Sequence, residues 1–516
     1  MSVSLPSPAR LPANSPAEDA AWALLCAKVA EIEHIDGVLG LLEWDQQTMM
    51  PAGGAAARGA QVSLLHGIQH RMTIDAALGD AVAQLADSAD VTRRAAARVI
   101  GRRHHRAVQV PEALVTALSE ARSAGFSAWM TARGERSFAP FADALDRIIS
   151  LSRELAACHG PAAHPYDNLL AEFDPGSSVS TLAPMFARLA DGLSGLVEAA
   201  AERGPPAALD LTIPEAVLDR VNRRVLESLG FRMQDGRLDP AEHPFTVGMH
   251  PGDVRLTTHN YATDVLGTLG GTIHEAGHGM YEQGMPVGLR GTGLCAAAGV
   301  GLHESQSRFW ENHIGRSAPF FAWLAPMLKE EGGIDVQPWQ LYGAANRVQP
   351  SLVRVKADEA TYNLHIIARF ELETAMIAGD VSTAELPDAW DAAYQRLLGV
   401  SASNPVDGVL QDVHWSSGYL GYFPSYTIGN LYAASFEAAM VQDLPGLWED
   451  VRRGEFAPVL AWLREKVHQR GALVDAPEVF ADAVGPRDPV ADLVRHLYRR
   501  HGNLLELDLP AEWAET

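Results

Sequence analysis

Two histidines four residues apart, with a glutamate directly after the first, form the segment of this chain best suited to chemistry. The segment is an HExxH sequence, His274-Glu275-Ala276-Gly277-His278. Side chains at i and i+4 lie on one face of a helix, so both imidazoles can reach a single metal ion. The glutamate beside the first histidine can take a proton from a metal-bound water. The pattern therefore predicts metal-assisted hydrolysis with Glu275 as general base.

The residues around this segment favour a buried helix. Apolar side chains recur at helical spacing, namely Val265, Leu266, Leu269, Ile273 and Met280. Gly277 is a poor helix former, at about 1 kcal/mol against alanine, but a small residue here lets another segment approach the metal. A second histidine pair with the same spacing, His66 and His70, has Gly67 in place of the glutamate. We interpret that pair as a surface or helix-packing feature.

A third metal ligand is expected downstream of the histidines, because a catalytic zinc site usually has three protein ligands and one open position. Glu304, in the segment GLHESQSRFWEN, is the best candidate. Spacing alone leaves two interpretations open. Glu304 either binds the metal or is an ordinary carboxylate on a helix surface.

Composition is that of a folded protein with an acidic balance. The chain has 516 residues, 47% hydrophobic and 20% charged, and a formal net charge of −23. This charge argues against nucleic acid as a partner, and the basic run over residues 93–106 fits an exposed helix face. No apolar stretch is long enough for a membrane span. Three widely separated cysteines without a CxxC motif favour a reducing compartment, so the predicted location is cytoplasmic.

Most of the chain is predicted to be helical, as one domain over residues 21–516. Helical periodicity appears near residues 18–43, 138–159, 179–202, 298–314, 356–378, 387–399 and 427–441, and Pro111 begins a further helix. Residues 1–20 are rich in Pro, Ser and Ala and predict a disordered tail. Residues 243–259 predict two short strands joined by a turn at 250–253, a place where an extended peptide can add to a sheet edge.

Several segments resemble those of the thermostable carboxypeptidase family, the M32 metallocarboxypeptidases, and they follow one another in the order expected for that family. They are LEWDQQTMMP at 42–51, HPF at 243–245, DVRLT at 253–257, HEAGH at 274–278, HESQSR at 303–308, VRVKADEATYNLHIIARFELE at 353–373 and GVLQDVHW at 408–415. The resemblance covers nearly the whole chain, from about residue 20 to the end. One departure is His259-Asn260-Tyr261 after DVRLTT, where family members commonly continue with Arg-Tyr. Detail at the end of the groove is therefore left open.

The resemblance implies a fold, an activity and a metal site. The fold is mainly α, a two-lobed helical metallopeptidase with a deep groove and a small β-sheet, similar to angiotensin-converting enzyme and neurolysin. Helices in about residues 21–130 are expected to form a mobile flap over the groove. The activity is metal-dependent removal of a broad range of C-terminal residues from peptides with a free C-terminus, by a homodimer. His274, His278 and Glu304 would hold Zn²⁺, or Co²⁺ in some members, with Glu275 as base.

Further residues are assigned from the same resemblance. His414 and Tyr422 resemble the His and Tyr that stabilise the oxyanion in related two-lobed peptidases. Tyr419 and Tyr426 are alternatives to Tyr422, and Tyr426 is also placed among the substrate-binding residues. The resemblance also implies that Arg255, in DVRLT, closes the end of the groove.

An exopeptidase must also bind a free α-carboxylate, and the planar fork of an arginine suits that task. Arg354 is our candidate, with Arg255 as its competitor. The alternative for Arg354 is a structural ion pair with Asp358 or Glu359, four and five residues on.

Four polar neighbours are predicted to support these sites. Asp253 and Thr257 are expected to be structural partners within DVRLT. Gln411 and Asp412 are expected to orient a ligand histidine, since metal-bound imidazoles usually have such a partner.

Two other kinds of function stay open. The chain could release dipeptides or cut internally, as a dipeptidyl carboxypeptidase or an oligoendopeptidase. It could also be a catalytically silent binding protein. The second alternative is less favoured, because such relatives usually lose a ligand or the base and here all four residues are present.

Overall fold

The computed structural model describes residues 15–204 and 209–514, which are mainly helical with one three-stranded sheet. Contacts within the chain divide it into two compact units. The first comprises Met1–Gln109, Pro286–Ala296 and Gly471–Val474, and the second comprises Val110–Met285, Ala297–Arg470 and Asp475–Thr516. None of the described helices has the length and apolar composition needed to cross a membrane.

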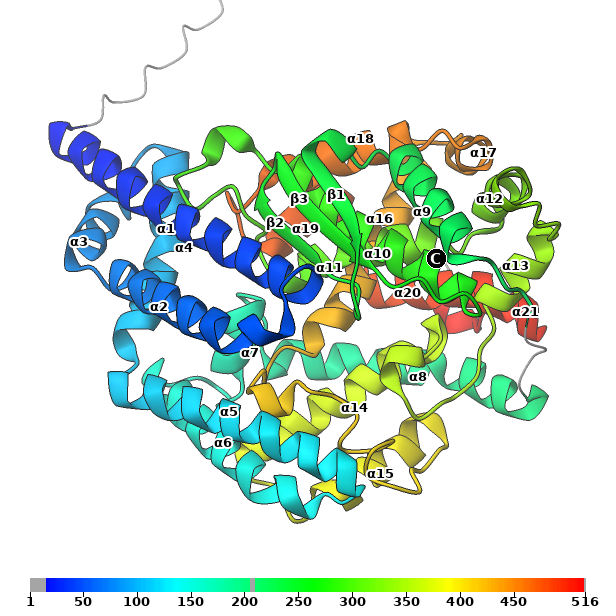
Figure 1. The fold of residues 1–516 in the computed structure, drawn as a ribbon, viewed down its shortest axis with the longest axis horizontal. Coiled ribbons are helices and arrows are strands. Elements are labelled where there is room, and N and C mark those ends of the chain that lie inside the picture. Colours follow the sequence, from blue (N-terminus) through cyan, green and yellow to red (C-terminus); the bar gives the residue numbers. More distant parts are fainter. Residues whose placement is uncertain (1–14, 205–208, 515–516) are drawn as a thin grey trace, which may run out of the picture. The chain divides into compact units, whose positions relative to one another are not determined.

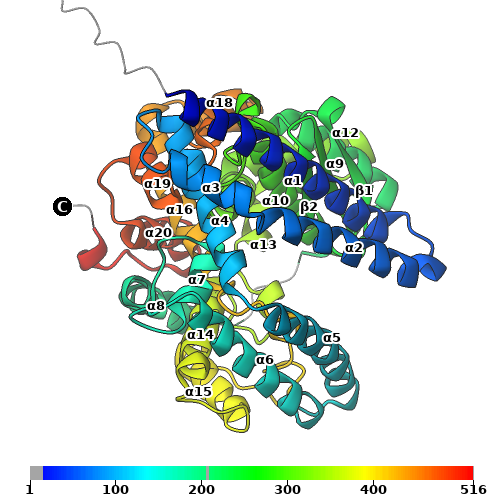
Figure 2. The ribbon, with the colours of Figure 1, turned by 90° about the vertical axis from the view of Figure 1, so that its left-hand side faces the viewer.

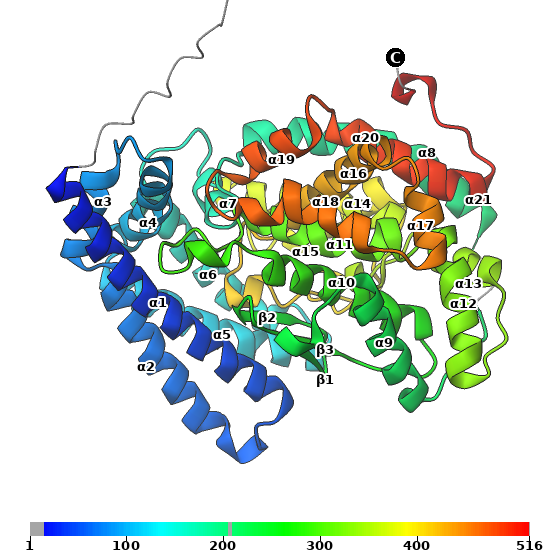
Figure 3. The ribbon, with the colours of Figure 1, turned by 90° about the horizontal axis from the view of Figure 1, so that it is seen from above.

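The first unit is built from four helices around an apolar core. They are α1 (Pro16–Thr48), α2 (Ala55–Thr73), α3 (Ala76–Leu85) and α4 (Val91–Gln109). The buried side chains of Leu25, Leu85 and Ala96 belong to this core. Figure 3 shows α1 and α2 side by side.

The start of α1 corrects the predicted boundary of the tail. Ser15 and Glu18 form a capping box, in which the Ser15 hydroxyl accepts from the Glu18 N–H and the Glu18 carboxylate accepts from the Ser15 N–H. This box with Pro16 at the first helical position begins the helix, so residues 16–20 are helical rather than part of a tail. The rest of the predicted tail, residues 1–14, lies outside the described residues.

The second unit contains the remaining helices and the sheet. Its helices are α5 (Glu112–Glu135), α6 (Ala139–Cys158), α7 (Asp167–Phe173), α8 (Val179–Arg203), α9 (Glu215–Leu229), α10 (Val265–Gly284), α11 (Val300–Arg308), α12 (Ala318–Gly332), α13 (Pro338–Ala345), α14 (Glu359–Ala378), α15 (Leu386–Leu398), α16 (Pro424–Asp443), α17 (Leu447–Arg453), α18 (Ala457–Lys466), α19 (Ala476–Val484), α20 (Pro489–Leu497) and α21 (Asn503–Leu505). Figure 2 shows α5 packed beside α6. A continuous apolar core includes Phe186 of α8, Phe370 of α14 and Trp390 of α15.

The sheet lies against α10, which carries HExxH (Figure 1). Its strands are β1 (Gly236–Pro240), β2 (Thr246–His250) and β3 (Asp253–Thr258), in the order β1-β3-β2. The antiparallel pairing of β2 with β3 confirms the two predicted strands. Strand β1, which pairs with β3 in parallel, was not predicted, because GRLDP combines Gly, Asp and Pro and has the composition of a turn.

The predicted helices are present, with one internal change. The segment predicted as one helix over residues 298–314 is α11 followed by a π-helix at Phe309–Ile314. Helix α5 begins within residues 21–130, extends to Glu135, and belongs to the second unit. The single domain and the mobile flap stay predictions.

Candidate active site

Helix α10 presents the two histidines of HExxH toward one point. Asp264 caps the helix by accepting from the Gly267 N–H, and the buried side chains of Leu269, Ile273 and Met280 anchor its apolar face. His274 and His278 are one turn apart on this helix, with ring centroids separated by 4.9 Å.

Three ligand atoms from α10 and α11 converge. The Oε2 atom of Glu304 lies 3.4 Å from Nε2 of His278 and 3.9 Å from Nε2 of His274. Ligands at about 2.0–2.1 Å in tetrahedral geometry are themselves separated by roughly 3.3 Å. The three residues therefore fit a small divalent ion, and they form one of two groups of His and carboxylate ligands within the described part of the chain.

The outer nitrogen of each histidine is held by a partner that directs its inner lone pair to the same point. His274 Nδ1 lies 2.9 Å from the carboxylate of Glu311, so it donates its proton there and leaves Nε2 free to bind a metal. His278 Nδ1 lies 2.6 Å from Nδ1 of His303, whose Nε2 lies 2.8 Å from the carboxylate of Glu282. The Glu282 carboxylate can only accept, so Nε2 of His303 donates to it and Nδ1 of His303 is the acceptor. Nδ1 of His278 therefore donates to His303, which again leaves Nε2 of His278 unprotonated.

Glu304 is kept ionised by its surroundings. Burial alone would raise the pKa of this carboxyl group, but the charges of Arg308 and His274 outweigh burial and hold the pKa well below its usual range. Arg308 donates to Oε1 of Glu304 over 2.7 Å, which leaves Oε2 directed at the histidines. The ring of Tyr362 lies beneath the Arg308 guanidinium, 4.3 Å from its centre. Glu304 is therefore arranged as a one-oxygen ligand.

Glu275 has a different environment from Glu304. Its carboxylate accepts a hydrogen bond of 2.6 Å from the Thr246 hydroxyl, and that hydroxyl also lies 3.0 Å from the Glu275 carbonyl oxygen. Strand β2 thus fixes the position of this side chain relative to α10. Burial raises the pKa of Glu275, in the direction that makes a carboxylate a better proton acceptor.

Two glycines allow α11 to lie against both of its neighbours. A Cβ atom on Gly277 of α10 would lie 2.5 Å from the Gln306 carbonyl oxygen, and 2.5 Å from Cα of Ser307. A Cβ on Gly429 of α16 would lie 2.7 Å from Cγ of Glu304. The contact at Gly277 is with backbone, so no side-chain rotation can relieve it. The close approach predicted for Gly277 is confirmed, and the approaching segment is the helix that carries Glu304.

We expect Gly277→Ala to disrupt the metal site. The added methyl group must separate α10 from α11 and so move Glu304 away from the histidines, and overpacking of this kind costs about 1–3 kcal/mol. Gly271→Ala on the same helix is the control, because its Cβ would meet only Pro244 Cγ at 3.6 Å, an ordinary contact. Metal content and denaturant unfolding of both variants test the prediction. Full metal binding by Gly277→Ala would contradict it.

His414, Tyr422 and Tyr426 lie together. His414 Nε2 is 3.3 Å from the Tyr426 hydroxyl, and the rings of Tyr422 and Tyr426 are 5.3 Å apart. Burial raises the pKa of both phenols, and the charge of Glu304 adds to the rise, so both lie within electrostatic reach of the metal ligands. The pKa of His414 is lowered to about 4 by burial and by the charge of Arg354. Tyr419, at 50% exposure, is the most open of the candidates.

Buried Nδ1 of His414 has no hydrogen-bond partner within the described residues. An orphaned polar atom at this position is costly unless a ligand satisfies it. This atom therefore fits a side chain that meets part of a bound substrate.

The local ion pair considered for Arg354 does not form with Asp358 or Glu359. Arg354 donates instead from Nε and Nη2 to Asp412, over 2.9 and 2.8 Å. Asp358 caps α14 through the N–H groups of residues 360 and 361. A partner 58 residues away along the chain could not be inferred from local spacing.

Gln411 and Asp412 do not contact a ligand histidine, so their predicted role is wrong. Asp412 binds Arg354 and Arg369, and Oε1 of Gln411 accepts from the Arg354 N–H and from Nη2 of Arg369. Burial would raise the pKa of Asp412, but the two arginines hold it well below its usual range. The pair positions arginines rather than imidazoles.

Arg255 lies on β3 and is held by its own motif. Its guanidinium binds the Asp253 carboxylate through two contacts of 3.0 and 3.1 Å. The Thr257 hydroxyl accepts from the Phe245 N–H over 2.8 Å, which joins DVRLT to HPF. Both expected structural partners are therefore engaged, Asp253 by Arg255 and Thr257 by the backbone before β2.

The sequence interpretation missed the outer partners Glu311, His303, Glu282 and Arg308. Spacing held a partial signal, because Arg308 and Glu311 follow Glu304 by four and seven residues and so lie on its side of a helix. Glu282 follows His278 by four residues on α10.

The second candidate metal group, His313, Glu359 and His496, is better explained as an ion network. His496 places Nδ1 2.7 Å from Glu437 and Nε2 2.8 Å from Glu359, so both nitrogens must donate and the ring is an imidazolium. His313 Nδ1 also lies 2.7 Å from Glu437, and Arg500 donates to Glu359. Protein donors already occupy the carboxylates, which leaves no reason to place a cation there.

This network makes a specific prediction about acid stability. Burial would raise the pKa of both Glu359 and Glu437. The charges of Arg500 and His496 outweigh burial at Glu359 and hold its pKa well below the usual range. At Glu437 the charge of His496 is the main cause that holds the pKa well below the usual range. A depressed folded-state pKa stabilises the fold above the unfolded pKa, about 4.3, and that stability is lost as pH falls below it. We expect Glu437→Gln to lower the free energy of unfolding at pH 7 by roughly 3–5 kcal/mol and to flatten its dependence on acid pH. Equal denaturation midpoints for variant and wild type at both pH 7 and pH 4 would contradict this account.

Comparison with known proteins identifies the family of this chain. Residues 25–501 match the family described as carboxypeptidase Taq (M32) metallopeptidase. Thermostable carboxypeptidase 1 of Thermus thermophilus is 37% identical over 492 residues, which cover 92% of this chain and 96% of the relative. Carboxypeptidase 1 of Bacillus subtilis is 34% identical over 482 residues, covering 92% and 96% of the two chains.

Solved structures agree with the sequence comparison. The crystal structure of M32 carboxypeptidase from Deinococcus radiodurans R1 superposes on this chain with a TM-score of 0.92 at 35% identity. The superposition covers 95% of this chain and 100% of the other. The chain belongs to the carboxypeptidase Taq (M32) family of metallopeptidases.

Proposed function

We propose that this chain is a zinc carboxypeptidase that removes single residues of broad identity from peptides with a free C-terminus. Family membership supports hydrolysis of peptides at the carboxyl end. The observation that carries the proposal is the convergence of His274, His278 and Glu304 on one point, with Glu275 beside them. Two imidazoles and one carboxylate are a donor set that catalytic zinc accepts.

In this proposal His274, His278 and Glu304 hold the ion, and Glu311 and His303 orient the two imidazoles. The bound metal supplies Lewis-acid chemistry, because it lowers the pKa of a water and polarises the scissile carbonyl. Glu275 takes a proton from the attacking water and returns it to the leaving amine. The Thr246 hydroxyl keeps the Glu275 carboxylate in place during both transfers.

Two groups near Glu304 are assigned to the developing oxyanion. The Tyr422 hydroxyl and the unpartnered Nδ1 of His414 are donors that can face a substrate carbonyl. Loss of one donor of this kind typically costs about 2.7–4 kcal/mol in the transition state. Tyr426, hydrogen-bonded to His414, is assigned to substrate binding and to holding that ring.

Arg354 is proposed to receive the substrate α-carboxylate, with Arg255 as the competing group. Asp412 holds Nε and Nη2 of Arg354, and Nη1 donates to the Tyr362 hydroxyl over 3.2 Å, so the second N–H of Nη1 is assigned to the ligand. Arg255 binds the Asp253 carboxylate through the same edge of its guanidinium, Nε and Nη2. Zinc rather than cobalt, a homodimeric state and a cytoplasmic location complete the proposal.

Product analysis of a free peptide and its C-terminally amidated twin tests this function. We expect the metal-loaded protein to shorten only the free peptide, one residue at a time, because the amide lacks the carboxylate that an arginine would bind. Equal cleavage of the amidated twin would replace the proposal with an oligoendopeptidase, and release of residue pairs with a dipeptidyl carboxypeptidase. No cleavage of any peptide would favour the binding-protein alternative.

A further inference from the structure

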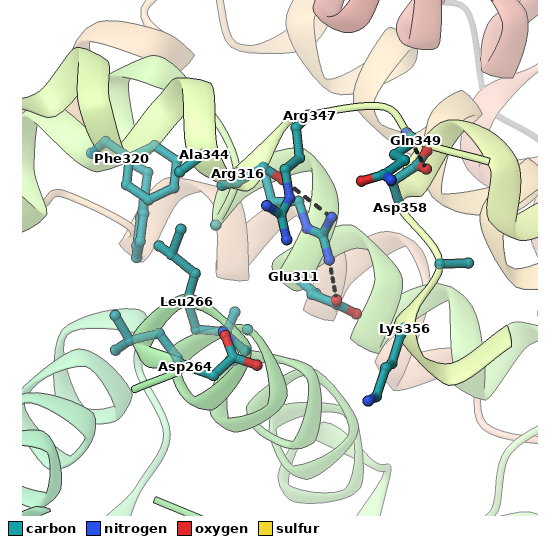
Figure 4. Close-up of a pocket in the computed structure, with 18 of the residues that line it drawn as sticks. Asp264, Leu266, Glu311, Arg316, Phe320, Ala344, Arg347, Gln349, Lys356 and Asp358 are labelled. Atoms are coloured by element: carbon teal, nitrogen blue, oxygen red, sulfur yellow. Dashed lines mark hydrogen bonds and ion pairs between the residues drawn. The ribbon is translucent and has the colours of Figure 1, made fainter. Parts of the chain in front are cut away.

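A cavity of about 430 Å³ lies next to the candidate active site (Figure 4). Gly270 and Ile273, which form part of its wall, belong to the turn of α10 directly before His274. Glu311 forms another part of the wall. Its Oε1 atom accepts from Arg316, and its Oε2 atom contacts the ring of His274. Glu311 thus belongs both to the wall of the cavity and to the contacts of His274, one of the proposed metal ligands.

The acidic groups of the cavity are already engaged. Glu311 accepts from His274, Arg308 and Arg316. Asp358 accepts from backbone N–H groups at the start of α14 and from that of Gln349. Asp264 caps α10. Each carboxylate therefore has its negative charge balanced or directed at hydrogen-bond donors within the protein.

Two cations of the same cavity have no such partner. The side chains of Arg347 and Lys356 make no hydrogen bond or ion pair with any residue in the described ranges 15–204 and 209–514. The third cation, Arg316, is bound to Glu311 over 2.9 Å. Figure 4 shows all three cations around one space. Uncompensated positive charge here stands out in a chain of net charge −23, which repels anions overall.

Another part of the wall is apolar. Leu266, Phe320 and Leu324 are among the residues that line it. A cavity with apolar walls and a few convergent charged groups is typical of a site that binds an organic ligand and fixes its charged end. An aliphatic stem ending in a carboxylate matches both parts of the surface.

We propose that this cavity is a carboxylate-binding site that receives an acidic side chain of the peptide substrate, with Arg347 and Lys356 as its charge-reading residues. The inference rests on the proposed peptidase function, and it adds a preference to an otherwise broad activity. The same carboxylate chemistry could be supplied by a free dicarboxylate anion, so the experiment distinguishes the two sources.

The first arm uses peptides that differ only by Glu or Gln, placed in turn at the C-terminal residue and at each of the three preceding positions. We expect one position at which Glu raises kcat/KM over Gln by about two- to fivefold, the range of a partly exposed ion pair. Arg347→Gln and Lys356→Gln should bring that ratio toward one, and added salt should do so in wild type. Lys329→Gln is the matched control, since Lys329 is 66% exposed, pairs with Asp335 and does not line the cavity.

The second arm measures binding without turnover. Calorimetry with Glu275→Gln and each peptide pair should show tighter binding of the Glu peptide, lost when Arg347→Gln is added. Because this readout needs no hydrolysis, it separates failure of the cavity proposal from failure of the proposed peptidase function. Equal affinities and equal rate ratios in all variants would overturn the proposal.

The third arm adds succinate to the Gln peptides. A saturable change in rate that requires Arg347, with no position of Glu preferred, would overturn the substrate assignment and establish a free anion as the ligand. No effect of succinate, together with a preferred Glu position, supports the proposal as stated.

Discussion

Glu275→Gln is expected to lower kcat by about 100- to 10,000-fold while the protein keeps its metal. Glutamine has the shape of glutamate, and its carbonyl oxygen can still accept from the Thr246 hydroxyl, so the helix and the strand beside it should stay in place. The amide cannot take a proton from water. The effect should therefore fall on turnover rather than on folding or on metal binding.

The measurement is kcat on an unblocked peptide together with metal content per chain. Glu330→Gln, at a carboxylate that is 65% exposed on α12, is the control for loss of one negative charge. Activity within about tenfold of wild type in Glu275→Gln would show that another group acts as the base. Loss of metal together with activity would show that Glu275 is a structural part of the site.

Glu304→Gln is expected to weaken metal binding by at least about 100-fold. Loss of an outer hydrogen-bond partner typically costs 10–100-fold in affinity, and Glu304 is a direct ligand in this account. The variant also removes the negative charge that faces both Nε2 atoms. Arg308 retains Glu311 at 3.3 Å, so the buried guanidinium is not left without an acidic partner.

Competition with a chelator of known affinity measures this loss. Denaturant unfolding of the metal-free proteins gives the accompanying change in stability, so that a folding defect is recognised. Unchanged affinity in a folded Glu304→Gln protein would remove Glu304 from the ligand set and leave only the two histidines of α10.

The parts of the site predicted most directly from sequence are those fixed by local geometry. The positions of His274 and His278 follow from helical spacing, and the apolar residues before them predict the buried helix. Glu304 needed the family resemblance, because its position depends on the approach of α11 to α10 at Gly277. The two strands were predicted from β-branched residues around a turn, whereas parallel pairing of β1 had no local signal.

The errors have a common physical origin. For Arg354, chain spacing offers an ion pair four or five positions away as the alternative to carboxylate binding, whereas its partner Asp412 is 58 positions away. Gln411 and Asp412 are predicted to orient an imidazole, but they bind Arg354 and Arg369. Buried charges take whichever opposite charge the tertiary fold brings near, and chain spacing contains little information about that choice.

The π-helix at Phe309–Ile314 is a related case. The apolar pattern continues through it as through an α-helix, so sequence predicted one helix. The wider turn sets the direction of Glu311, which reaches His274 from one side, and of His313, which reaches Glu437 from another. Such segments are often found at functional sites, and this one lies between the candidate metal site and the buried ion network.

The central claim is that one metal ion held by His274, His278 and Glu304 is required for hydrolysis at the C-terminus of peptides. The most direct test strips the wild-type protein with a chelator, returns zinc in sub-stoichiometric steps, and measures C-terminal trimming at each step. The account predicts negligible activity without metal and a linear rise that ends at one ion per chain. Full trimming by the stripped protein would contradict the account.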